Sequence, residues 1–318
     1  MAEIIQRDGA WTFDGTTVRI TPGLHRSVPL FRQTYGEIAV PLEAVAGIVY
    51  EPERKRGRLR LRLREGADPL LQATGGRLPD RADPYRLVVD LDASGVAEYV
   101  AEEIRHALLL DQVPKEPAKA YLVPGPPVPV SVRSSDGTVS FDGTQVRIDW
   151  ADSADRVKRA TGPRVINMGD VVRVEWLPNT GHEDGLLRFV TRETVFAKLP
   201  PEKDPYALDL WGSARRDLLT ALVATAVTAR LPHPSSRTGD GRDQDADGHP
   251  DRHPDRHQDR HQDGHRDRSA CAAVAPSPRS DHHDVLLRRL RELGELHRDG
   301  VLTDEEFART KAVVLRGF

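Results

Sequence analysis

The chain has 318 residues, which predicts about two domains plus shorter segments if a domain takes ~150 residues. Hydrophobic residues make up 38% and charged residues 30% of it, so part of the chain is expected to be polar and to lack a core. A net charge of −3 excludes a chain-wide attraction for nucleic acid or for anionic membranes, and any such affinity must be local.

The sequence favours a soluble, cytoplasmic protein. Cys271 is the only cysteine, so no internal disulfide can form, which fits a reducing compartment. The first residues lack the basic stretch and apolar core of a signal peptide. The longest apolar-rich run, residues 218–229, is interrupted by threonines and is shorter than the roughly 20 residues that span a bilayer.

A hairpin motif occurs twice and organises the chain. Residues 8–20 contain Asp-Gly, then Phe-Asp-Gly-Thr, then Val-Arg-Ile, and residues 136–148 repeat this pattern at an offset of 128 residues. A glycine-bearing turn between two short β-rich runs is a hairpin signal. Because the same hairpin opens two long segments, the sequence predicts a duplicated domain.

The first repeat is expected to contain short strands followed by one helix. Residues 57–64 alternate between leucine and arginine, which is the period of a half-buried strand. Residues 70–71 are expected to form a weak strand. Residues 96–110 have apolar side chains at helical spacing. The remaining expected strands are residues 10–13, 16–20, 38–40, 45–50 and 87–91.

The second repeat follows the same order. An Asp-Pro-Tyr sequence precedes the last strand of each repeat, at residues 83–85 and 204–206. The expected helix covers residues 215–229. Its expected strands, after the hairpin, are residues 165–166, 171–176, 186–191, 194–197 and 208–210.

About seven short strands and one amphipathic helix is the element order of a pleckstrin-homology-like (PH-like) barrel, whose helix plugs an open end. The hairpin and the Asp-Pro-Tyr sequence resemble a bacterial family, domain-of-unknown-function family 4429, usually found in tandem. The resemblance covers residues 1–113 and 130–232. It implies an α+β fold with two tandem PH-like β-barrels, each closed by a C-terminal helix, and it supplies no catalytic residues.

Two polar segments connect the expected domains. The proline-rich residues 114–129 predict a semi-rigid linker. Residues 233–281 have no apolar periodicity and predict a disordered tether. Histidines recur every four residues in this tether and are weak metal-ligand candidates, but prolines between them oppose the helix that would align them. These histidines are His249, His253, His257, His261 and His265.

The last segment, residues 282–318, predicts a helical hairpin. Its pattern, from the leucines through Gly300 to a Leu-Thr and a Glu-Glu-Phe sequence, is similar to the short C-terminal domain called SHOCT. A segment of this length rarely folds unassisted. Its apolar stripe is therefore expected to pack against another surface, which could be a second copy, the repeats or another protein. The resemblance favours oligomerisation or partner binding. The residues of the stripe are Leu286, Leu290, Leu293, Leu296, Phe307 and Val314.

An arginine stripe is the strongest electrostatic feature of the first repeat. Its guanidinium groups could meet phosphates of anionic lipid or nucleic acid. The alternative is a solvated outer face of an antiparallel sheet, which we favour. In the second repeat Leu186 and Val190 replace two of these arginines, so we expect that face to be covered there by the first repeat or a partner. The stripe residues are Arg58, Arg60, Arg62 and Arg64.

The sequence contains no phosphate-binding loop, nucleophile elbow or metalloprotease motif, and we expect neither an enzyme nor a cofactor. We predict a non-enzymatic adaptor or scaffold whose barrels bind a protein or peptide and whose hairpin associates with itself or a partner. The alternative is peripheral binding of anionic lipid or nucleic acid through the arginine stripe.

Overall fold

The computed structural model describes residues 1–195 and 199–237, all of which belong to one compact unit, Met1–Arg237. The tether histidines and the apolar stripe of residues 282–318 lie outside the described residues, so their predictions stay predictions. We call residues 1–113 repeat 1 and residues 130–232 repeat 2.

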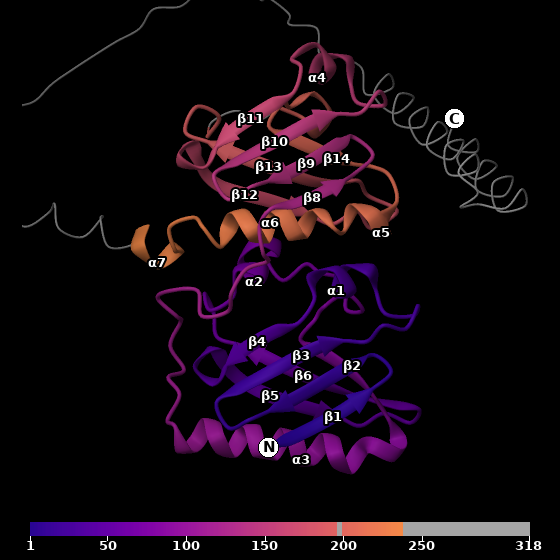
Figure 1. Ribbon diagram of the computed structural model, residues 1–318, viewed down its shortest axis with the longest axis vertical. Coiled ribbons are helices and arrows are strands. Elements are labelled where there is room, and N and C mark those ends of the chain that lie inside the picture. Colours follow the sequence, from indigo (N-terminus) through magenta and orange to yellow (C-terminus); the bar gives the residue numbers. More distant parts are fainter. Residues whose placement is uncertain (196–198, 238–318) are drawn as a thin grey trace, which may run out of the picture. The chain divides into compact units, whose positions relative to one another are not determined.

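Repeat 1 consists of two antiparallel sheets and three α-helices (Figure 1). The first sheet has the order β1-β2-β3-β4, and the second has the order β5-β6-β7. Helix α1 joins β3 to β4, α2 joins β6 to β7, and α3 follows β7. The bounds are β1 (Ala2–Gln6), β2 (Gly9–Phe13), β3 (Thr17–Pro22), α1 (Leu30–Tyr35), β4 (Ile38–Pro41), β5 (Val45–Glu51), β6 (Arg56–Leu63), α2 (Pro69–Thr74), β7 (Arg86–Asp90) and α3 (Ser94–Leu110).

Repeat 2 has the same arrangement of sheets, β11-β10-β9-β8 and β12-β13-β14, but its described helices differ from those of repeat 1. Four short 3-10 turns, Leu42–Ala44, Leu91–Ala93, Met168–Asp170 and Pro201–Lys203, precede β5, α3, β12 and β14 in the two repeats. The bounds are β8 (Val130–Arg133), β9 (Gly137–Phe141), β10 (Gln145–Trp150), α4 (Arg156–Ala160), β11 (Arg164–Asn167), β12 (Val171–Leu177), β13 (Gly185–Thr191), β14 (Ala207–Leu210), α5 (Ala214–Asp217), α6 (Thr220–Thr228) and α7 (Pro234–Arg237).

The duplicated hairpin forms the same turn in both repeats. The Asp14 carboxylate accepts hydrogen bonds from the amides of Thr16 and Thr17, at 3.0 and 2.8 Å. Asp142 does the same for Thr144 and Gln145, and these amides lower the pKa of Asp142 to about 2. The motif therefore fixes a turn between β2 and β3 and between β9 and β10.

The expectation of closed barrels is wrong. In each repeat the four-stranded and the three-stranded sheet share no backbone ladder among the described residues. At the corner where β1 approaches β7, a side chain makes the connection instead: Gln6 Oε1 accepts from the Asp90 amide at 2.9 Å. The fold is α+β with two tandem repeats of open sheets.

Residues 70–71 belong to helix α2 and not to a strand. Asp68 caps this helix, because its carboxylate accepts from the amides of Leu70 at 2.9 Å and Leu71 at 3.2 Å. Pro69 occupies the first helical position, which needs no donor. In repeat 2, Thr194 lies in a turn and not in the expected strand.

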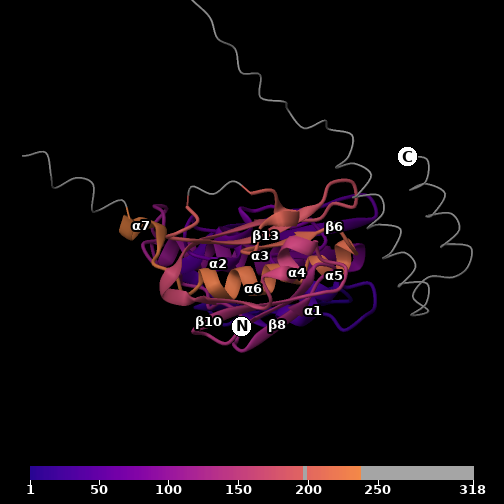
Figure 2. The same cartoon turned by 90° about the horizontal axis from the view of Figure 1, so that it is seen from above.

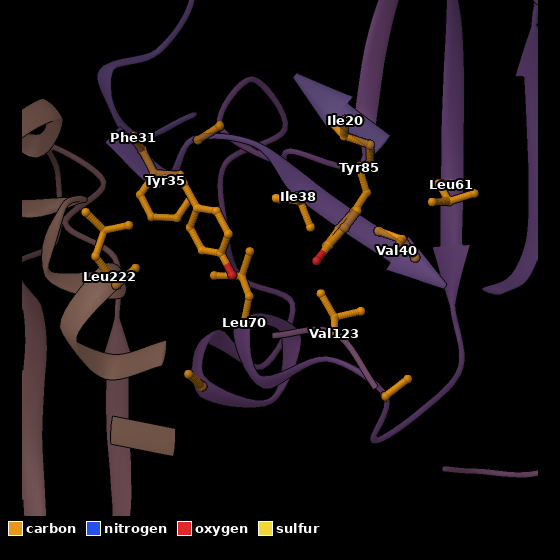
Figure 3. Packing of buried hydrophobic residues seen from close by; sticks show 14 of the residues in the cluster. Ile20, Phe31, Tyr35, Ile38, Val40, Leu61, Leu70, Tyr85, Val123 and Leu222 are labelled. Carbon is orange, nitrogen blue, oxygen red and sulfur yellow. The ribbon is translucent and has the colours of Figure 1, made fainter. Parts of the chain in front are cut away.

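Helix α6 lies between the sheets of repeat 2 and helix α2 of repeat 1 (Figures 1 and 2). All nine of its residues, Thr220–Thr228, are buried and none is charged. Leu222 of α6 belongs to the same buried cluster as Phe31, Tyr35 and Leu70 of repeat 1 (Figure 3). The two repeats thus share one hydrophobic core.

The linker is bonded to repeat 1 through residues 116–123. The amides of Ala118 and Leu122 donate to the carbonyls of Glu65 and Ala67, both at 2.8 Å. The end of repeat 2 reaches the same turn, since His233 Nε2 donates to the Gly66 carbonyl at 2.9 Å. A side chain at Gly66 would meet the Ala118 carbonyl at 2.9 Å, and the φ of Gly66 is +76°. This turn therefore requires glycine.

Candidate anion-binding cleft

The arginines of the stripe lie on the exposed face of β6 and in the residue after it, but they have different surroundings. Arg64 donates to the backbone carbonyls of Glu43 at 2.9 Å and Glu116 at 2.9 and 2.7 Å, which is a structural role. Arg60 and Arg62 stay exposed. Arg58 lines one cleft and Arg64 lines a different one, so the structure does not bring the predicted set together as one site.

The cleft has a volume of about 220 Å³ and lies at the corner where the two sheets of repeat 1 meet. Six arginines and three aspartates contribute to its lining, together with Ser27 and the apolar Pro29, Leu87 and Val88. The charged residues are Arg7, Arg32, Arg56, Arg58, Arg81, Arg86, Asp8, Asp80 and Asp90. The lining is therefore predominantly cationic.

A buried ion pair forms the base of the cleft. Arg32 of α1 is 3% exposed, and its Nη1 lies 2.7 Å from Asp8 Oδ2 in the turn between β1 and β2. The same carboxylate oxygen accepts from the Val88 amide of β7 at 3.4 Å. Asp8 thus ties the first sheet, α1 and the last strand together, and Arg32 is held by packing and charge.

Two arginines of the rim make exposed ion pairs. Arg56 Nε lies 3.1 Å from Asp90 Oδ1, and Arg58 pairs with Glu53. Exposed pairs of this kind contribute little stability, about 0–1 kcal/mol, so a ligand can recruit their guanidinium groups. Arg81 is exposed and has no ion pair with any described residue.

Arg86 is the most enclosed rim arginine. Its Nη1 lies 2.5 Å from Asp80 Oδ2, and its Nε lies 3.2 Å from Asp83 Oδ2. Burial raises the pKa of Asp83, and Arg86 opposes that rise. Asp80 is 68% exposed, so it can move away from Arg86 when another anion arrives.

The corresponding corner of repeat 2 is filled. Lys158 of α4 is 0% exposed, and its Nζ lies 2.5 Å from Asp136 Oδ2 and 2.9 Å from the Ala207 carbonyl. The Asp209 amide donates to Asp136 at 2.9 Å, as Val88 does to Asp8 in repeat 1. The residues at the positions of Arg7, Arg56, Arg58 and Arg86 are Ser135, Asp184, Leu186 and Ala207.

The outer face of β13 in repeat 2 is covered by the chain itself. Leu186 and Val190 are both buried. Arg188, on the same face, donates to the Leu199 carbonyl at 2.6 Å and to Asp204 at 2.7 Å, so residues 199–204 cross this face. Burial of the two apolar side chains requires no partner protein.

Sequence reasoning missed most of the cleft. Arg7 and Arg32 lie far apart in the chain from each other and from the neighbouring pair Arg81 and Arg86. The signal that could have found them is the comparison of the two repeats, since position 7 differs from 135 and position 86 from 207 in charge. Across residues 1–195 and 199–237 there is no cluster of metal-ligating side chains, and no helix has the length and apolar character to cross a membrane.

Comparison with known families adds to this geometry. Residues 11–105 and 139–228 match the model of a family described as Domain of unknown function (DUF4429), and together they make up more than half of the chain. The chain belongs to the DUF4429 family. Residues 288–315 match the Short C-terminal domain, SHOCT. Comparison with curated proteins gave no match.

Both expected resemblances are therefore confirmed as family matches. A corner aspartate lies just before each DUF4429 region, Asp8 in repeat 1 and Asp136 in repeat 2, and accepts from a backbone amide within that region. They differ in the arginines that surround it. The cleft is a feature of the first DUF4429 region and its flanking turn only.

Proposed function

We propose that this DUF4429 protein is a non-enzymatic adaptor whose repeat 1 binds an anionic group of a protein partner in the arginine cleft. The observation that supports this most is the contrast between the repeats. Both repeats use an aspartate and a basic residue to join their sheets, but only repeat 1 adds a ring of recruitable arginines. Because repeat 2 folds without these arginines, they are available for binding in repeat 1.

The proposal includes a PH-like ancestry for the repeats and a role for the C-terminal segment. The order of strands followed by a helix is typical of PH-like domains, many of which are binding modules. Residues 282–318 would associate with a second copy or with a partner, since the SHOCT match lies there. When two binding elements are linked in one chain, binding of the first raises the effective concentration of the second near its own ligand.

The size of the full chain in solution tests the adaptor part. We expect the full chain to form a defined oligomer or to bind a partner protein, and a chain that ends near Ser280 to be monomeric. Light scattering after gel filtration measures both masses. Two monomers of the expected mass would rule out self-association.

The alternative is peripheral binding of anionic lipid or nucleic acid, and it draws on Arg60 and Arg62, which are exposed beyond the cleft. Such binding depends on the sum of the charges and weakens steeply with salt. Under this alternative, Arg60→Ser and Arg62→Ser reduce binding as much as Arg58→Ser. Under the cleft proposal, only Arg58→Ser does so.

A further inference from the structure

We infer that the cleft of repeat 1 binds the phosphate of a phosphorylated side chain on a protein partner. This inference rests on the proposed function, in which the cleft takes an anionic group. It goes further by assigning the chemistry of that group from the number of donors, the size of the cleft and the charges of its rim.

The number of guanidinium groups favours phosphate over carboxylate. A carboxylate has two oxygens and is satisfied by one bidentate arginine. A phosphate monoester has three terminal oxygens and about two negative charges, so it can accept from several arginines at once. Five arginines with exposed guanidinium groups or with ion pairs that a ligand can replace line this cleft: Arg7, Arg56, Arg58, Arg81 and Arg86.

The size of the cleft favours a group attached to a larger molecule. Its volume of about 220 Å³ is smaller than the roughly 300–1,000 Å³ of sites that enclose whole small molecules. No aromatic side chain lines it, so it offers no stacking surface for a nucleotide base. Pro29, Leu87 and Val88 provide apolar surface for the aliphatic stem of a phosphorylated residue.

The rim argues against a flat anionic surface such as a membrane. The side chains of Asp80 and Asp90 are 68% and 54% exposed beside the arginines. A lipid surface pressed onto the rim would face these carboxylates at short distance. A single phosphate that enters the cleft displaces them from their arginines one at a time.

Binding of three peptide libraries to the full chain tests the inference. Each library has random flanking residues and a fluorescent label, and the central residue is phosphoserine, glutamate or serine. We expect the phosphoserine library to bind at least about tenfold tighter than the glutamate library, which is on the order of one additional charge-assisted hydrogen bond. Arg58→Ser and Arg81→Ser should each weaken phosphoserine binding about tenfold.

Arg62→Ser is the matched control, because it removes the same charge from the same face of β6 outside the cleft. We expect it to leave affinity within about twofold. Equal binding of the phosphoserine and glutamate libraries, dependent on Arg58, would overturn the phosphate inference and leave the proposed anionic cleft standing. Lack of Arg58-dependent binding by both libraries would overturn both.

Two further probes distinguish other sources of phosphate. Inorganic phosphate should compete with the phosphoserine library in the same assay, because both occupy the arginines. Vesicles of phosphatidylcholine with phosphatidic acid should bind no better than vesicles of phosphatidylcholine alone. Arg58-dependent binding to the acidic vesicles, with no preference among the peptides, would assign the site to lipid and reject the inference.

Discussion

At the scale of single residues, several buried acids are held in unfavourable surroundings. Asp68 caps α2 inside repeat 1, and burial raises its pKa to about 6 despite two backbone donors. Burial raises the pKa of Asp217 in repeat 2 to about 6 as well, although Asn179 donates to it at 3.0 Å. Tyr35 and Tyr85 lie close to the same core (Figure 3), and burial raises the pKa of both phenols.

Asp68 makes the stability of the fold depend on pH in a defined direction. Its pKa is raised on folding, so its contribution to stability is complete below about pH 4 and is lost as the pH rises through about 6. Asp68→Asn keeps an acceptor for the helix cap and removes the titration. The rise of the Asp68 pKa from 3.8 to about 6 corresponds to about 3 kcal/mol of unfolding free energy.

We therefore expect Asp68→Asn to become more stable relative to the natural chain as the pH rises from 4 to 7. Urea unfolding at several pH values measures the difference. Asp142→Asn is a useful control because that carboxylate is exposed in a turn. A difference between the natural chain and Asp68→Asn that does not change with pH would show that Asp68 is not desolvated.

The two corner ion pairs should differ in their effect on stability. Lys158→Ala removes the ammonium group beside the fully buried Asp136 and is expected to cost about 3–5 kcal/mol. Arg32→Ala removes the partner of Asp8, which is 20% exposed and can be hydrated, so its cost should be clearly smaller. Denaturant midpoints of both variants give the comparison, and equal losses would contradict it.

At the scale of elements, the helices that end the two repeats, α3 and α6, differ in sequence because they have different surroundings. Helix α3 has one buried face, formed by Ala97, Val100, Ala101 and Ile104, and its other face contains charged residues. Helix α6 is buried on all sides and has no charged residue. The difference follows from α2, which covers α6, whereas within residues 1–195 and 199–237 helix α3 packs mainly against strands.

A charge placed on each helix tests this difference. Leu222→Glu puts a carboxylate into the shared core and is expected to destabilise the protein by several kcal/mol, on the order of 3–5. Val96→Glu at the exposed start of α3 should change the unfolding free energy by less than about 0.5 kcal/mol. Thermal unfolding of both variants is the measurement, and a stable Leu222→Glu protein would contradict the shared core.

The sequence predicted the elements with a strong period and missed those that depend on tertiary contacts. The alternation of residues 57–64 correctly placed the arginines on the exposed face of β6. Residues 70–71 are too few to show a helical period, and the sequence signal for this helix is the cap residue Asp68 followed by Pro69. The cleft could not be predicted from one strand, because it forms where Arg32 and Arg86 meet residues of β6.

At the scale of the whole molecule, the described part of the chain is expected to unfold as one unit. Repeats joined by a flexible linker would unfold separately, but here the core is continuous and the linker is bonded to repeat 1. Variants that retain only Trp11, in repeat 1, or only Trp176, in repeat 2, report on each half. We expect the two fluorescence transitions to coincide.

Different unfolding midpoints for the Trp11 variant and the Trp176 variant, both without Leu222→Glu, would show that the repeats unfold independently. Introducing Leu222→Glu into both reporters provides the positive control, because the transitions should then move apart. The same experiment shows whether repeat 1 keeps its structure when its contact with α6 is weakened.

The uncharged surface of α6 also has a consequence for how this gene can change. A recombination event that removed one repeat would expose apolar surface of α2 or α6 to water, so the two copies are no longer interchangeable parts. Substitutions at their junction must be compensated on both sides. The rim of the cleft is free of that constraint, so specificity can diverge there while the duplicated framework stays the same.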